Sequence, residues 1–156
     1  MLLGGLHKLA GITANAFIGH KNDFMIQDCI MVSKKLGINF YFNDKFPINS
    51  LYLMRGTLVL EENLLEKYID IFFESYWQLN LDLSDRKIFE KKLNEIGVDI
   101  NKFFKDIENQ AIKDKLKEIT NEAFTKKIFG APSFIYKDKV YWGQDRLDYV
   151  IDEVIK

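Results

Sequence analysis

The sequence predicts a predominantly helical α/β fold. At 156 residues the chain is the length of one domain. It contains only two prolines and nine glycines, so few residues interrupt its helices. Near the C-terminus, two short segments rich in aromatic and β-branched residues flank a turn at 137–139, which predicts one hairpin. We therefore expect five or six helices, then a hairpin and a terminal helix.

Composition excludes several classes of protein. Twenty-two basic and twenty-three acidic side chains give a net charge of -1, which argues against a general nucleic-acid binder. The single cysteine, Cys29, excludes an internal disulfide and a cysteine zinc site. No apolar run approaches the roughly 18 residues of a membrane span. The N-terminus has no basic leader, so we expect a cytoplasmic protein. From the composition as a whole we expect no metal, no nucleic acid and no membrane partner.

The first fifty residues contain one clear helix. Residues 1–20 are small and apolar without a strong period, which is typical of a loop or an irregular helix. A helix with a broad apolar face is expected from Asn22 or Asp23 to Gly37, where glycine provides the left-handed cap. Residues 38–42 alternate briefly between apolar and polar side chains.

Capping residues mark the next helices. Asn49, two residues after Pro47, is the expected N-cap of a short helix. Aromatic and aliphatic residues then recur at helical spacing over 61–77. Asp85 and Asp99 are the expected starts of two further helices.

The pattern changes after residue 127. The segment 110–127 is the most regular amphipathic helix of the chain. Pro132 ends that pattern, and strands are expected at 133–136 and 140–142. A last helix is expected from Gln144, with its apolar residues on a buried side: Leu147, Val150, Ile151, Val154 and Ile155.

Four separated motifs resemble one known family. The sequences FGAPSF at 129–134 and WGQDRL at 142–147 resemble the C-terminal end of the 2-hydroxychromene-2-carboxylate isomerases, which are relatives of the kappa-class glutathione transferases. FPINSL at 46–51 followed by Arg55-Gly56, TNEA at 120–123, and GGL at 4–6 with Lys8 and Gly11 are also similar to this family. The resemblance covers essentially the whole chain.

The resemblance implies a thioredoxin-like core of the DsbA type, with a large helical insertion. It assigns 1–20 to a remnant of the N-terminal thioredoxin half and 21–127 to the helical insertion. Residues 128–156 become the C-terminal thioredoxin half, with the cis-proline loop, hairpin and helix. The family pattern has a strand, a helix and a second strand before the position of Met1, so we expect this chain to be N-terminally truncated.

The implied function is that of a glutathione-dependent isomerase acting on a small electrophilic substrate. In the family, glutathione is the cofactor, and a serine at the start of the first helix holds its thiol as a thiolate. That serine falls before Met1, and none of the serines here matches it, so no catalytic residue is assigned. Cys29 lies among apolar residues of a helix and is interpreted as a structural residue.

Ala131 and Pro132 are the first candidates for cofactor binding. The resemblance implies a cis bond between them, which turns the N–H and C=O of Ala131 outward like an open strand edge. An extended γ-glutamyl-cysteinyl backbone can pair with such an edge. The alternative is a structural turn that starts a strand.

Three further residues complete the predicted site. By resemblance, Gln144 and Asp145 bind the γ-glutamyl group at a helix N-terminus, where free N–H groups favour a carboxylate. The alternative for Asp145 is an ordinary helix N-cap. Lys21 matches a lysine that reaches a carboxylate of glutathione or substrate, and its alternative is a solvated surface charge. A glutathione-contacting asparagine of the family falls at Ile12, which offers no donor or acceptor.

Without the first strand-helix-strand unit, the hairpin would have an open edge that invites pairing with another chain. We therefore expect a complementing chain, a homodimer that covers the edge, or a weakly stable remnant. Two functions stay open at this point: the glutathione-dependent isomerase, and a non-catalytic remnant or interaction module of the same fold.

Overall fold

The computed structural model describes residues 1–155, which form two compact units. Residues Asn15–Asp114 make up one, here called the helical unit; residues 1–14 and the chain from Lys115 on make up the other, the terminal unit. The predominantly helical class is confirmed, with one two-stranded sheet in the described part. No helix of the described residues has the length and apolarity to cross a membrane.

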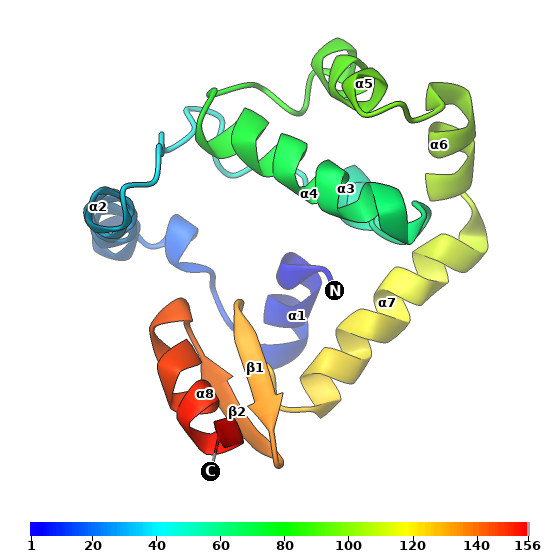
Figure 1. Ribbon diagram of the computed structural model, residues 1–156. Helices are drawn as coiled ribbons and strands as arrows, with labels where there is room; N and C mark the ends of the chain where they lie inside the picture. The colour runs from blue at the N-terminus through cyan, green and yellow to red at the C-terminus, as the bar shows by residue number, and fades with distance from the viewer. Residues whose placement is uncertain (156) are drawn as a thin grey trace. The chain divides into compact units, whose positions relative to one another are not determined.

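The helical unit contains six helical elements and the start of a seventh (Figure 1). They are η1 (Asn15–Phe17), α2 (Gly19–Leu36), α3 (Leu51–Gly56), α4 (Glu62–Trp77), α5 (Arg86–Glu95), α6 (Ile100–Ile107) and the first turn of α7 (Gln110–Thr125). The terminal unit holds the rest of α7 and the other elements. These are α1 (Leu3–Ala10), β1 (Ser133–Tyr136), β2 (Lys139–Trp142), η2 (Gln144–Arg146) and α8 (Leu147–Ile155).

Aromatic rings fill the core of the helical unit. Phe72 of α4 stacks on Phe89 of α5 with ring centroids 4.5 Å apart, and Tyr68 meets Phe72 edge to face at 4.7 Å. Phe103 of α6 joins them, 6.0 Å from Phe89. All four are buried. Such ring pairs add about 0.5–1.5 kcal/mol beyond the area that they bury. The aromatic spacing of 61–77 thus places α4 at the centre of this unit.

Gly56, the last residue of α3, lets that helix lie against the aromatic core. It is buried, and a Cβ atom built on it would overlap the Tyr68 hydroxyl and lie 2.9 Å from Cζ of Phe103. The Tyr68 hydroxyl donates to the carbonyl oxygen of Leu53 in the same helix, at 3.1 Å. The glycine is therefore required for the packing of α3 against α4 and α6.

The expected caps are mostly confirmed. The carboxylates of Asp85 and Asp99 accept hydrogen bonds from the N–H groups of Lys87 at 2.8 Å and Lys102 at 2.9 Å. Gly37 ends α2 in the left-handed conformation, with φ of 68°. Asn49 was expected as the N-cap of α3, but Ser50 occupies that position. The Asn49 side chain still accepts from an N–H of the first turn, that of Leu51, at 3.1 Å.

Residues 38–50 form no strand, despite their brief alternation. Asn43 holds this segment onto the end of α4. Its buried side-chain amide donates to the carbonyl oxygens of Tyr76 at 2.8 Å and Leu81 at 3.0 Å, and its Oδ1 accepts from the N–H of Lys45 at 2.8 Å. A buried amide with these groups satisfied specifies a single loop conformation.

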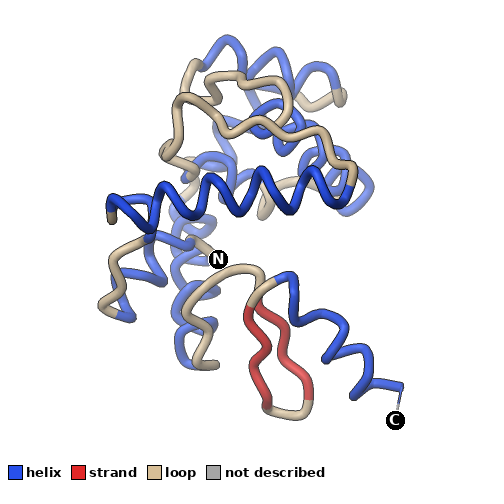
Figure 2. The backbone as a smooth tube through the Cα atoms, turned by 90° about the vertical axis from the view of Figure 1, so that its left-hand side faces the viewer, coloured by secondary structure: helices blue, strands red, loops and turns tan. Residues whose placement is uncertain are grey.

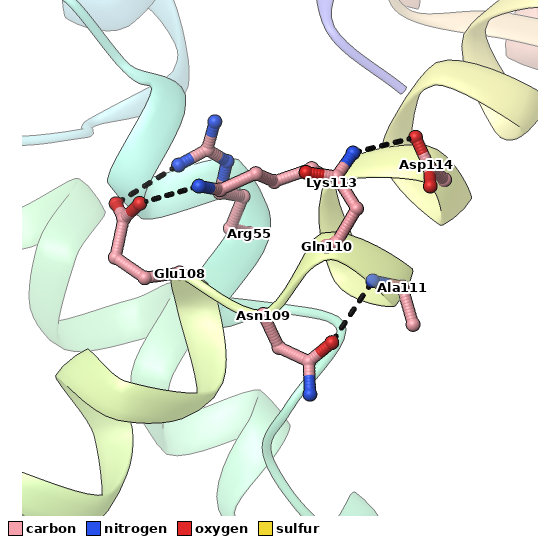
Figure 3. Close-up of polar contacts among 7 residues, drawn as sticks. All are labelled: Arg55, Glu108, Asn109, Gln110, Ala111, Lys113 and Asp114. Atoms are coloured by element: carbon pink, nitrogen blue, oxygen red, sulfur yellow. Dashed lines mark hydrogen bonds and ion pairs between the residues drawn. The ribbon is translucent and has the colours of Figure 1, made fainter.

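An ion triad connects α3 to the junction of α6 and α7 (Figure 3). Glu108 accepts from Arg55 at 3.1 Å and pairs with Lys113 at 2.7 Å. The side chain of Arg55 is only 12% exposed, so its charge needs a nearby counterion. Lys113, then Arg55, hold the pKa of Glu108 below its ordinary value, although partial burial opposes them.

The terminal unit pairs α1 with the C-terminal half of α7. Leu6 is fully buried, and the N–H of Leu2 donates to the Thr120 hydroxyl at 2.9 Å. The expectation of a loop or irregular helix at the N-terminus is wrong for α1, which is regular and capped by Gly11 with φ of 66°. Gly5 lets α1 lie close to α7, because a Cβ atom added to it would lie only 3.3 Å from Cγ2 of Thr120.

The predicted hairpin is confirmed. β1 and β2 pair antiparallel, with Ser133 opposite Trp142 and Tyr136 opposite Lys139. The two turn residues, Lys137 and Asp138, have φ of 45° and 63°, as a two-residue turn of type I′ requires. Figure 2 shows the two strands and α8 following one another at the C-terminus.

The expectation of a buried side on the last helix is wrong, and the broad apolar face predicted for α2 is also open to solvent. On α8, Ile151 is 44% and Val154 56% exposed, because the hairpin beside it offers only two strands to cover it. On α2, no residue is buried, and Phe24 and Met31 are more than half exposed. Periodicity identified both helices correctly, but it does not reveal whether anything covers their apolar faces.

Substituting Gly56→Ala is expected to destabilise the helical unit by about 1–3 kcal/mol, because the added methyl overpacks the contact with Tyr68 and Phe103. Urea unfolding followed by the fluorescence of Trp77, in a Trp142→Phe background, measures it. Gly19→Ala is the matched control, since no atom lies within 4 Å of its added Cβ. Equal midpoints for the two variants would contradict the packing role of Gly56.

Removing the Glu108 carboxylate should lower the free energy of unfolding at pH values above the pKa of Glu108, but not below it. A depressed folded-state pKa gives stability that is present at neutral pH and lost as the pH falls through that pKa. Glu108→Gln is therefore expected to unfold at lower urea than the parent at pH 7, and at the same urea near pH 3. Because the carboxylate is exposed, 0.5 M salt should shrink the difference at pH 7. A pH-independent difference would show that the ion pairs do not contribute.

Candidate functional site

The segment 129–132, between α7 and β1, is fixed by the second strand of the hairpin. Gly130 is buried, and a Cβ built on it would lie 2.5 Å from Nε1 of Trp142. The ring of Phe129 meets that indole at 5.0 Å, and the Ser133 hydroxyl donates to the Gly130 carbonyl oxygen at 2.8 Å. Glycine is thus required here because the backbone passes directly beneath the Trp142 ring.

The backbone of Ala131 is open to solvent. Ala131 and Pro132 are both exposed, and the peptide bond between them is cis, as is the Phe46–Pro47 bond. Within residues 1–155, neither the N–H nor the C=O of Ala131 has a hydrogen-bond partner. These two groups are therefore available to an extended peptide that lies along the loop.

One backbone hydrogen bond brings the two predicted halves of the site together. The N–H of Gly143 donates to the carbonyl oxygen of Pro132 at 3.0 Å. Ala131 and Pro132 therefore lie at the same end of the hairpin as Gln144 and Asp145, which follow Gly143 directly. Both Gln144 and Asp145 are exposed.

The final helix begins with a 3₁₀ turn, not with a capped α-helical turn. Gly143, with φ of 105°, is the N-cap of η2 and has no side chain to bond. In the described part of the chain, the Asp145 carboxylate accepts no backbone hydrogen bond, so its interpretation as an N-cap is wrong. Its partner is the Arg146 guanidinium, at 2.8 Å.

Arg146 at the site, and Glu153 at the other end of the hairpin, make ion pairs that the sequence interpretation missed. Glu153 of α8 pairs with Lys139 of β2 at 2.7 Å, which holds the last helix to the hairpin. Lys139 and then Tyr141 hold the pKa of Glu153 below its ordinary value. Neither contact has a helical i,i+4 spacing, so no local pattern signals them.

Lys21 and Ile12 belong to different units. Lys21 is exposed in the first turn of α2, in the helical unit, whereas Ile12 and the four residues around the hairpin end belong to the terminal unit. The structure therefore brings together Ala131, Pro132, Gln144 and Asp145. The role of Lys21 stays a prediction.

The cysteine does not have the properties of a reactive residue. Cys29 is half-buried, and burial together with the neighbouring Asp28 raises the pKa of its thiol. A nucleophilic cysteine needs the opposite shift. In the part of the chain that the structure describes, no group of three His, Cys, Asp or Glu side chains is arranged to hold a metal ion.

Comparison with known proteins agrees with this architecture. The family model of the DSBA-like thioredoxin domain matches residues 2–154. A solved 2-hydroxychromene-2-carboxylate isomerase superposes with a TM-score of 0.85 over 99% of this chain and 76% of its own, at 19% identity. That likeness shows a shared fold.

Curated relatives are similar over about half of the chain. The 2-hydroxychromene-2-carboxylate isomerase of Sphingobium xenophagum is 22% identical over 54% of this chain and 44% of its own length. The enzyme of the same name from Pseudomonas sp. (strain C18) is 26% identical over 51% and 38%. The matched stretch thus spans less than half of each relative. The match over residues 2–154, with the hairpin and helices described above, shows that the chain belongs to the DSBA-like thioredoxin domain family.

Proposed function

We propose that this chain binds glutathione as a member of the glutathione-dependent isomerases of the 2-hydroxychromene-2-carboxylate type. The observation that supports it is the hydrogen bond between Gly143 and Pro132, which places the open backbone of Ala131 beside Gln144 and Asp145. The low-identity relatives that carry this name support the same class.

Two residues of the site, Ala131 and Asp145, suit particular parts of the tripeptide. The N–H and C=O of Ala131 pair with the extended cysteinyl backbone, as an added strand would. The Asp145 carboxylate accepts from the γ-glutamyl ammonium group. Its existing partner, Arg146, lies in an exposed pair of the kind that contributes at most about 1 kcal/mol, so a ligand can displace it.

Glutathione held by Ala131 and Asp145 would supply a thiol nucleophile for the isomerisation of a small electrophilic substrate with an unsaturated carbonyl group. The residues of this chain bind and orient the peptide. None of its serines matches the thiol-holding serine of the family, so thiol activation is not assigned to any described residue.

The alternative function is a non-catalytic binding or interaction module of the same fold. The observation that favours it is that the hydroxyl next to the site in sequence, that of Ser133, already donates to the Gly130 carbonyl oxygen at 2.8 Å. A turnover assay with glutathione and 2-hydroxychromene-2-carboxylate separates the two. Conversion supports the isomerase, and binding of glutathione without conversion supports the module.

Glutathione is expected to bind weakly, with little or no retention on immobilised glutathione, because the contacts are to its main chain and ammonium group only. NMR can follow a titration with glutathione up to about 20 mM, a concentration high enough to detect millimolar dissociation constants. The amide signals of Ala131, Gln144 and Asp145 should shift. Asp145→Asn should abolish these shifts, and a glutaryl analogue without the ammonium group should not cause them. Asp148→Asn, on the next turn, is the control.

Two outcomes contradict that expectation in different ways. No shift at any of the three amides would refute glutathione binding at this site. Firm retention on immobilised glutathione that is lost on Asp145→Ala would show that the site is complete without a thiol-holding serine.

We further propose that the apolar side of the hairpin and α8 is covered in the assembled protein, by a second copy or a complementing chain. Trp142 and Ile151 are 52% and 44% exposed, and Ile155 is 79% exposed. Because α8 lies against β1 and η2, these exposed apolar side chains support a contact surface on this side.

Self-association is expected to depend on this patch. The chain should sediment above its monomer mass of 18.3 kDa, and Ile151→Glu should restore the monomer. Lys137→Glu, at the hairpin turn, is the control and should leave the mass unchanged. A monomer at all concentrations would contradict a homodimer.

A further inference from the structure

The helical unit contains a small cavity between α3, α5 and α6 that shares no residue with the proposed glutathione site. Its volume is about 230 Å³, and a cavity of roughly 150 Å³ can already hold one benzene molecule. Leu83 and Phe89 are buried in its wall. Leu53 and Phe104 are half-buried there, so the floor of the cavity is apolar. A larger apolar cavity, between α3, α4 and the loop 46–50, adjoins it.

The rim of the smaller cavity consists of hydrogen-bonding side chains. They are Asn49, Tyr52, Ser84 and Arg86, and all four are exposed. The Asn49 Oδ1 atom accepts from the N–H of Leu51 at 3.1 Å, so its NH2 group stays free to donate. Each of the four side chains can donate a hydrogen bond. A ligand that carries acceptor atoms therefore suits this rim.

Arg86 is the one charged side chain that lines this cavity in the described part of the chain. Its guanidinium carbon lies 3.9 Å from the centre of the Phe104 ring, so the planar group stacks on the cavity wall. Its Nε atom donates to Glu90 at 2.7 Å. Within residues 1–155, its two terminal nitrogens have no hydrogen-bond partner. Such a pair of nitrogens can bind both oxygens of one carboxylate.

The carboxylates near Arg86 do not take this position. Glu90 bonds to the Nε atom alone. The carboxylates of Asp85 and Asp82 accept from nearby backbone N–H groups, at 2.8 and 2.9 Å. None of these three residues lines the cavity. Their charges weaken the attraction of this region for an anion, so a ligand needs both the apolar floor and the guanidinium.

We propose that this cavity binds a small aromatic carboxylate, with its ring on the apolar floor and its carboxylate on the terminal nitrogens of Arg86. A ring beside Phe89 and Phe104 makes the edge or offset contacts that aromatic groups favour. Because the Arg86 side chain is 66% exposed and already pairs with Glu90, we expect weak, millimolar binding. The site is independent of the proposed function.

Three probes of the same shape and different charge test the role of Arg86. Benzoate is an anion, benzamide is neutral and benzamidinium is a cation. The side-chain amide of Asn49 and the ring of Phe104, both in the cavity wall, report binding by NMR. Benzoate is expected to bind about fivefold more tightly than benzamide, the factor that an exposed ion pair can supply, and benzamidinium more weakly than either. In about 0.5 M salt, the preference for benzoate should shrink.

A set of variants tests the location of the carboxylate. Arg86→Gln should bring the dissociation constants of benzoate and benzamide within about twofold of each other. Lys87→Gln removes the same charge at an exposed position outside the cavity wall, so it is the matched control and should keep the preference. Arg86→Lys keeps the charge but not the planar pair of donors, and it should lose part of the preference. Circular dichroism verifies that each variant is folded.

Three results would overturn the proposal. They are no saturable shift of the Asn49 and Phe104 signals with benzoate up to about 20 mM, equal affinity for benzoate and benzamidinium in the parent chain, or equal effects of Arg86→Gln and Lys87→Gln on the preference. None of these results bears on glutathione binding, which has its own titration. Selective, salt-sensitive binding of benzoate that depends on Arg86 supports the proposal.

Discussion

The helical unit depends on the close approach of α3 to the aromatic core at Gly56. Because that residue has no side chain, the Tyr68 hydroxyl reaches the backbone of α3 and bonds to Leu53, and the Phe103 ring lies against the same turn. The neighbouring Arg55 is thereby held at the junction of α6 and α7, where Glu108 neutralises it. One glycine thus sets both the packing of the core and the position of the ion triad.

A comparable constraint orders the terminal unit. Gly130 passes beneath Trp142, and the Pro132 carbonyl accepts from Gly143, so the loop before β1 and the turn after β2 are fixed to each other. The open backbone of Ala131 results from this arrangement, since its neighbours are bonded and it is not. A rigid support with one unpaired strand edge suits recognition of an extended peptide.

The two units therefore offer different chemistry. In the terminal unit, backbone groups and the exposed carboxylate of Asp145 suit a charged peptide in contact with water. In the helical unit, the cavity between α3, α4 and the loop 46–50 is lined mainly by apolar side chains, and no charged side chain of the described residues lines it. The two surroundings differ because water hydrates the exposed Asp145 carboxylate, whereas a charge buried among apolar side chains would lose its hydration.

The sequence by itself determined most of the helices, several of their caps and the hairpin, because these follow from residues near each other in the chain. The carboxylates of Asp85 and Asp99 bond N–H groups two and three residues away, and the hairpin follows from a two-residue turn. The motifs around Pro132 and Gln144 also identified the family and the residues that now lie together.

Only the tertiary structure decided which apolar faces are covered and which polar groups meet. The exposed faces of α2 and α8, the Arg146–Asp145 pair and the unpartnered Tyr76 hydroxyl have no signature in local spacing. The spacing of apolar residues predicts that one face of a helix is apolar. Whether that face is buried depends on segments that are distant in the chain. The cavity is of the same kind, since its wall combines side chains from the 46–57 region with others from 68–83.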